Sequence, residues 1–355
     1  MRERSLAKAF ALTVAGLLVF ILYLYFFVGI SDMIEVFRRV NPYSCLPIYF
    51  ATIVAMVLSM LFYSMSWNTL LKALSVNAGL KKAFIYCWLG NFVDLIIPLE
   101  TISGEVVRTY LVQRDSWDPG RVVASVIAHR IITVFVTLSS LLAASLFLFF
   151  RYEIGAEILY LLAMINAGSL TLIVLLLYVS LREEAAEKIV NAFVKVVSLI
   201  VGKSRLNPSE ARKKVYQSLI QFHSGFKSFG KRLDAVAKSV AYGFVAWVFH
   251  LSVYLLVFYA LGFNEISMKV VESIVVYAVS LAVQSAPIAL PLGLVEIIMT
   301  KLYTLFNIPT AIGGVATLLI RAVTFWFQIA VGYVLAQWIG VKELIGQKPK
   351  ETSTC

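Results

Sequence analysis

Long apolar stretches alternate with short charged connectors along most of this chain. Runs of more than twenty residues with hardly a charge occupy residues 9–30, 47–71, 122–150, 158–181, 240–262 and 312–339. A helix of about 20 residues crosses the hydrocarbon core of a bilayer, and longer runs fit with some tilt. The pattern therefore predicts an all-α polytopic membrane protein with about six full spans.

Two other apolar stretches, residues 80–114 and 269–306, are interrupted near their middle by proline and glycine. The interruptions read PLETISG at 98–104 and PIALPLG at 287–293, and their flanks of some fifteen to eighteen residues are short for a span. Because proline ends a helix, and irregular backbone at membrane depth must be buried in protein or water, we predict two re-entrant helical hairpins. Two pairs of kinked ordinary spans remain the alternative.

Positive charge in the connectors sets the orientation. Residues 182–238 carry twelve Lys or Arg against five acidic residues, and basic residues also precede the first span and follow the last. Cytoplasmic connectors are rich in Lys and Arg, so this linker and both termini are predicted to be cytoplasmic. The two hairpins then enter from opposite sides, and the two halves form an inverted-topology repeat.

We therefore divide the chain into a single transmembrane domain, residues 1–340, and a cytoplasmic tail, residues 341–355. The domain comprises repeat one at about 43–150, an amphipathic cytoplasmic linker at about 182–238 and repeat two at about 239–340. Within the linker, residues 185–200 and 215–229 are amphipathic stretches and are predicted to lie on the inner leaflet.

Composition narrows the functional classes. Of 355 residues, 60% are apolar and 13% are aromatic, which leaves no stretch for a soluble catalytic domain. The net charge of +11 lies in the connectors, so it reflects membrane orientation, and we expect no nucleic-acid partner. The cysteines at positions 45, 87 and 355 have no paired or metal-ligating spacing, and we expect no metal and no cofactor.

Four charged residues lie inside stretches that are otherwise suited to lipid. Glu105 and Arg130 are twenty-five residues apart, and so are Glu296 and Arg321, in matching elements of the two repeats. Each arginine lies some ten residues into its span, about 15 Å deep at ~1.5 Å per residue. A central arginine costs about 2.5–3.5 kcal/mol on insertion scales, so each needs a partner. The glutamates are the natural partners, within one repeat or across the two.

These charges predict a binding site near the bilayer midplane. The planar guanidinium of arginine makes bidentate contacts to phosphate, so we expect an anionic phospholipid or a polyprenyl-phosphate lipid as the partner. The alternative is purely structural, with two buried ion pairs that fix the hairpins and touch no substrate. The candidate substrate-binding residues are Asn91, Asp94, Glu105, Arg108, His129, Arg130, Glu296 and Arg321.

Several of these residues lie in motifs that resemble a known family. The motifs are Gly90-Asn91-Phe92 through Pro98, Gly104-Glu105-Val106-Val107-Arg108, His129-Arg130, residues 287–293 with Glu296, and the block that begins Arg321-Ala322-Val323-Thr324. Over about residues 6–340 they resemble the flippase domain of bacterial lysylphosphatidylglycerol synthases.

The resemblance implies a stand-alone member of this flippase-like integral membrane family, whose domain is thought to move a lipid headgroup between leaflets. It implies site positions at Glu105, Arg108, Arg130, Glu296 and Arg321. The soluble aminoacyl-transferase domain is lacking, so lipid lysylation is not expected. One departure concerns the second site, where a single glycine precedes the glutamate and relatives usually show a glycine-rich run.

We therefore expect a lipid transporter of the plasma membrane that is not an enzyme. The hypothesis includes two cavities, one open to each leaflet, with rocking of the repeats alternating access. No P-loop motif occurs, so transport is expected to be downhill, proton-coupled through Glu105 or Glu296, or driven by a partner.

Two other classes stay open. One is a non-transporting scaffold or an accessory subunit for a lipid-modifying or glycosyl-transferring enzyme. The other is an intramembrane enzyme, for which Ile102-Ser103-Gly104 supplies only a fragment of a serine-protease motif. The sequence does not decide the oligomeric state, and a homo-oligomer is compatible with it.

Overall fold

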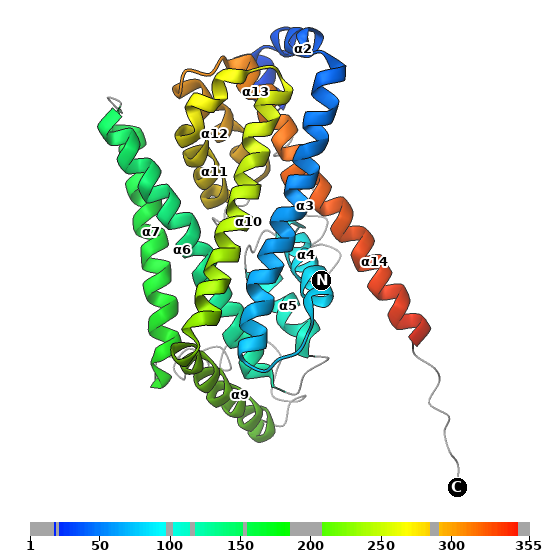
Figure 1. The fold of residues 1–355 in the computed structure, drawn as a ribbon, viewed down its shortest axis with the longest axis vertical. Coiled ribbons are helices and arrows are strands. Elements are labelled where there is room, and N and C mark those ends of the chain that lie inside the picture. The colour runs from blue at the N-terminus through cyan, green and yellow to red at the C-terminus, as the bar shows by residue number, and fades with distance from the viewer. Residues whose placement is uncertain are drawn as a thin grey trace.

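In the computed structural model, every element of the described part of the chain is a helix, which confirms the all-α fold (Figure 1). The description covers residue 18 and residues 21–96, 102–113, 118–151, 155–184, 208–284 and 291–346. In chain order the elements are η1 (Leu24–Val28), α2 (Ile30–Arg39), α3 (Pro42–Ala73), α4 (Leu80–Ile96), α5 (Ile102–Gln113), α6 (Pro119–Arg151), α7 (Ala156–Leu181), α9 (Pro208–Ser228), η2 (Phe229–Lys231), α10 (Leu233–Ala260), η3 (Asn264–Lys269), α11 (Val270–Gln284), α12 (Pro291–Leu305), α13 (Thr310–Arg321), η4 (Ala322–Phe327) and α14 (Gln328–Gly346).

Six helical segments of the described residues are long and apolar enough to cross a membrane, which supports the polytopic fold. Five of them coincide with predicted spans, namely α3, α6, α7, α10 and the run Thr310–Gly340 formed by α13, η4 and α14. The sixth is Asn264–Gln284, formed by η3 and α11, which covers the first arm of the second predicted hairpin. The span predicted at residues 9–30 lies mostly outside the described residues.

Helices α3 and α10, one from each half of the chain, lie side by side at the centre of the bundle (Figure 1). Ser59 Oγ on α3 donates to the Ala246 carbonyl at 2.9 Å, and Ser66 Oγ donates to the Ser239 carbonyl at 2.9 Å. Small residues let helix backbones approach closely, and interhelical hydrogen bonds add to their association where no water competes. The two halves of the chain therefore share one central helix pair.

The arms of each predicted hairpin, α4 with α5 and α11 with α12, pack against each other. Glycines permit the closeness of α4 and α5, because a Cβ at Gly104 would lie 2.4 Å from the Gly90 carbonyl oxygen. In Figure 1 the α4–α5 pair lies in the lower part of the bundle and the α11–α12 pair in the upper part. The connections at residues 97–101 and 285–290 lie outside the described residues. The re-entrant passage and the inverted repeat stay predictions.

The amphipathic stretch predicted at residues 215–229 forms the second part of α9, which crosses the lower end of the bundle (Figure 1). Its apolar face packs against α6, where Phe222 and Phe226 are buried. The contact is close, because a Cβ at Gly120 would lie 2.1 Å from the Ser218 carbonyl oxygen. This apolar face is therefore covered by protein, and only the opposite face is open to a membrane surface. The other predicted stretch, residues 185–200, lies outside the described residues.

Candidate functional site

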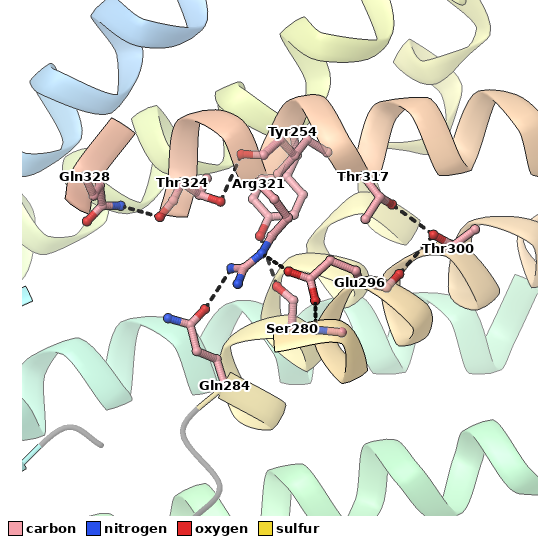
Figure 2. A network of polar contacts seen from close by, with 11 residues as sticks. Tyr254, Ser280, Gln284, Glu296, Thr300, Thr317, Arg321, Thr324 and Gln328 are labelled. Atoms are coloured by element: carbon pink, nitrogen blue, oxygen red, sulfur yellow. Dashed lines mark hydrogen bonds and ion pairs between the residues drawn. The ribbon is translucent and has the colours of Figure 1, made fainter. Parts of the chain in front are cut away.

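Arg321 lies at the end of α13, where the span changes to the π-helix η4. Its Nε donates to Glu296 Oε1 at 2.6 Å and its Nη1 donates to Gln284 Oε1 at 3.1 Å (Figure 2). Its guanidinium also lies 4.6 Å from the ring centroid of Phe325. The other oxygen of Glu296 accepts the N–H of Gly293 at 2.6 Å. The side chains of the pair are only 7% and 4% exposed, so both charges are compensated within the protein.

The pair with the same spacing in the N-terminal half of the chain is looser. Arg130 Nε lies 3.7 Å from Glu105 Oε1, beyond hydrogen-bond distance, and the two side chains are 26% and 21% exposed. Within the described part of the chain, the guanidinium of Arg130 makes no hydrogen bond. Partly exposed pairs of this kind contribute about 0–1 kcal/mol to stability. No described residue therefore occupies the N–H donors of Arg130.

Arg108 is buried and contacts no carboxylate of another described residue. Its Nη1 lies 3.2 Å from His129 Nδ1, and its guanidinium lies 5.2 Å and 5.8 Å from the ring centroids of Trp67 and Tyr63. Because arginine only donates, Nδ1 accepts this bond and neutral His129 carries its proton on Nε2. Cation–π contacts are worth about 2 kcal/mol or more when desolvated. His129 and the two aromatic rings thus hold the Arg108 side chain in place.

Polar side chains also connect the first hairpin to the last span. Asp94 Oδ1 accepts the hydroxyl of Ser103 at 2.7 Å and the N–H of Gly104 at 2.6 Å, so it caps the start of α5. Asn91 Nδ2 on α4 donates to Gln328 Oε1, on the first residue of α14, at 3.4 Å. Asp94 and Asn91 therefore have structural partners of their own.

One cavity of about 350 Å³ joins the two arginine sites. Its walls include Glu105, Arg108 and Arg130 from the first repeat and Gln284 and Arg321 from the second. Aromatic rings complete the wall, namely Tyr63, Trp247, His250, Tyr254 and Tyr277. The volume lies toward the low end of the range for small-ligand sites, and the lining combines apolar walls with a few polar groups, as such sites do. The arrangement can bind one small anionic group.

Six of the eight predicted site residues line this cavity, namely Asn91, Asp94, Glu105, Arg108, Arg130 and Arg321. Outside its lining, His129 and Glu296 each hold an arginine that reaches it. Arg130 on α6 and Arg321 on α13 line the same cavity, and the hypothesis of two cavities, one open to each leaflet, stays a prediction. Sequence reasoning missed the aromatic wall. Tyrosines inside apolar spans, which need a polar partner when buried, were the available signal.

Comparison with known proteins gives one family. The sequence profile described as "Lysylphosphatidylglycerol synthase TM region" matches residues 13–332. The chain is 23% identical to UPF0104 membrane protein PH1989 of Pyrococcus horikoshii over 336 residues, which cover 92% of this chain and 96% of that protein. It is 24% identical to a UPF0104 membrane protein of Methanothermobacter thermautotrophicus, over 88% of this chain and 90% of the relative. UPF0104 membrane protein MJ1595 of Methanocaldococcus jannaschii is 25% identical, over 99% of this chain and 100% of that protein. No solved structure matches the chain.

Proposed function

Since the chain belongs to the family of lysylphosphatidylglycerol synthase transmembrane regions, we propose that it is a lipid transporter. It moves a phosphate-bearing lipid headgroup between the leaflets of the plasma membrane. The proposal rests on the environment of Arg130. Its side chain lines the cavity, and its guanidinium makes no hydrogen bond to another described residue. An intramembrane arginine whose counter-ion lies beyond hydrogen-bond distance is costly to retain, and intramembrane arginines commonly mark a substrate site.

In this mechanism the three arginines of the cavity have different roles. Arg130 binds the phosphate with its planar fork, and Glu105, 3.7 Å away, is the counter-ion that the phosphate displaces. Arg321 is held by Glu296 and Gln284 through two of its N–H donors, so it shapes the opposite wall and contributes positive potential. Arg108 adds a fixed positive charge behind the site. Displaced Glu105 is then the group that would take up a proton.

The test is lipid movement in proteoliposomes that contain the purified protein. The labelled probes are an anionic phospholipid with ether-linked chains, phosphatidylglycerol and a polyprenyl phosphate, each with and without a pH gradient. The critical variant is Arg130→Gln. The matched control is Arg121→Gln on the same helix, because Arg121 is 42% exposed, pairs with Asp118 and lies outside the cavity lining.

We expect Arg130→Gln to abolish movement of the transported lipid, while Arg121→Gln moves it at the native rate and both variants keep native thermal stability. Movement that depends on Arg130 for one probe and not the others would name the lipid class. Native rates in Arg130→Gln, or no movement of any probe by the native protein, would contradict the proposal.

A further inference from the structure

A second groove lies outside the central cavity, between the end of α7 and the helix α9. Its volume is about 460 Å³, and apart from Glu183 its lining residues belong to α9 and η2. None of them lines the central cavity. The groove is therefore a separate feature, on the segment that the charge distribution assigns to the cytoplasmic side.

Two polar atoms beside this groove are buried without a partner in the described part of the chain. His223 is only 3% exposed, and its Nδ1 donates to the Ser180 carbonyl at 3.0 Å. Its Nε2 and the hydroxyl of Ser180 are both buried and make no hydrogen bond to a described residue. Buried polar groups are almost always paired, so an imidazole nitrogen left unpaired at a groove indicates a missing partner.

The groove also carries excess positive charge. Lys227 Nζ donates to Glu183 Oε1 at 2.7 Å, and this hydrogen bond together with the lysine charge lowers the pKa of Glu183. Lys231 lines the groove and has no partner among the described residues. Two lysines thus face one carboxylate. Tyr216 and Ile220 lie along the same side of α9 and are exposed. This side of α9 therefore presents both positive charge and exposed apolar surface.

We propose that this groove binds a phosphate-bearing anion, such as a phospholipid headgroup or a soluble organic phosphate. Lys231 and Lys227 contact the phosphate oxygens, and polar groups of the ligand pair with His223 Nε2 and the Ser180 hydroxyl, which lack a partner among the described residues. Tyr216 and Ile220 contact the apolar part of the ligand. The proposal is independent of lipid transport, because the groove shares no residue with the central cavity.

Calorimetric titration of the full chain in a non-ionic detergent tests the inference. The probes are a short-chain phosphatidylglycerol and glycerol phosphate, with a short-chain phosphatidylcholine for comparison. All titrations are repeated in Arg130→Gln, so that binding in the central cavity is separated from binding at the groove. The critical variants are Lys231→Gln and His223→Asn, since the asparagine amide keeps a donor for the Ser180 carbonyl and removes Nε2. The control is Lys238→Gln, whose ammonium is exposed, lies 3.9 Å from Asp234 and is outside the groove.

We expect Lys231→Gln to weaken binding about fivefold, as the loss of one lysine at an anionic lipid surface does, and His223→Asn to weaken it as well. Lys238→Gln should leave the affinity unchanged. Binding of phosphatidylglycerol alone would identify the lipid as the source, and equal binding of glycerol phosphate would identify the soluble anion. The proposal is overturned if neither probe binds, or if both critical variants bind with native affinity.

Discussion

Replacing Glu296 with glutamine is the sharpest test of the difference between the two ion pairs. One carboxylate oxygen of Glu296 accepts from Arg321 at 2.6 Å and the other accepts from Gly293 at 2.6 Å. An amide has a single oxygen, so one of these hydrogen bonds is lost, and bonds to charged groups contribute about 1.5–3 kcal/mol each. Because Arg321 is then left as a buried, uncompensated charge, the total cost should reach about 3–5 kcal/mol.

The equivalent change in the first repeat, Glu105→Gln, should cost about 1 kcal/mol or less. Arg130 makes no hydrogen bond to Glu105 at 3.7 Å, and both side chains are partly exposed in the cavity. Thermal unfolding of the purified variants in detergent measures the contrast. At roughly 2 °C per kcal/mol, Glu296→Gln should have an apparent Tm several degrees below that of Glu105→Gln.

A double variant provides the control. Combining Glu296→Gln with Arg321→Met removes both buried charges, and the pair should recover part of the stability lost by Glu296→Gln alone. Equal Tm losses for Glu296→Gln and Glu105→Gln would refute the reasoning, because they would mean that distance and burial do not distinguish the two pairs.

Three further predictions concern the packing of the hairpins, and thermal unfolding reads out each of them. Gly104→Ala should lower the stability of the protein by about 1–3 kcal/mol, since its Cβ would lie 2.3 Å from Asp94 Oδ2. The control is Gly168→Ala on α7, whose Cβ would have nothing within 4 Å and which should be neutral or stabilising. Equal effects of the two changes would contradict the close α4–α5 contact. Gly332→Ala should also destabilise the protein, because its Cβ would lie 2.4 Å from the Phe92 Cβ. The control is Gly340→Ala, whose Cβ would lie in open space and should leave the Tm unchanged. A native Tm in Gly332→Ala would rule out this contact of α14 with α4. Asp94→Asn should cost up to about 1 kcal/mol, because the amide is a weaker acceptor for Ser103 and Gly104, and a more stable variant would show that Asp94 is not the cap of α5.

The spans and the four intramembrane charges were accessible from the sequence. Hydropathy identifies helices that are long and apolar enough to cross the hydrocarbon core of a bilayer. Five of the six such helical segments among the described residues coincide with predicted spans. Equal spacing identified the glutamates as partners of the arginines and left open which glutamate pairs with which arginine; in the structure Glu105 pairs with Arg130 and Glu296 with Arg321. The length of an apolar run carries the information on the spans because bilayer thickness and the helix rise together fix how many residues a span needs.

The inequality of the two pairs could not be predicted, because the spacing is the same in both. It arises from Gln284, which reaches Arg321 only because the fold brings α11 and α13 together, and from the N–H of Gly293, which binds Glu296 locally within α12. The position of α9 is a similar case. The amphipathic pattern predicts that the apolar face of α9 is covered, but it does not distinguish cover by lipid from cover by α6. The shared cavity likewise depends on how α6 and α13 are placed in the bundle.

The π-helix η4 has a consequence for how Arg321 can move. A π turn holds one more residue than an α turn, and Ala322–Phe327 inserts this extra residue between Arg321 and Gln328. If the extra residue migrates along the span, the helix on one side rotates by about 100° and shifts by about 1.5 Å without breaking. The span can therefore re-aim Arg321 while Gln328 keeps its bond to Asn91. Such a register slip would move Arg321 without the break in the helix that a hinge requires.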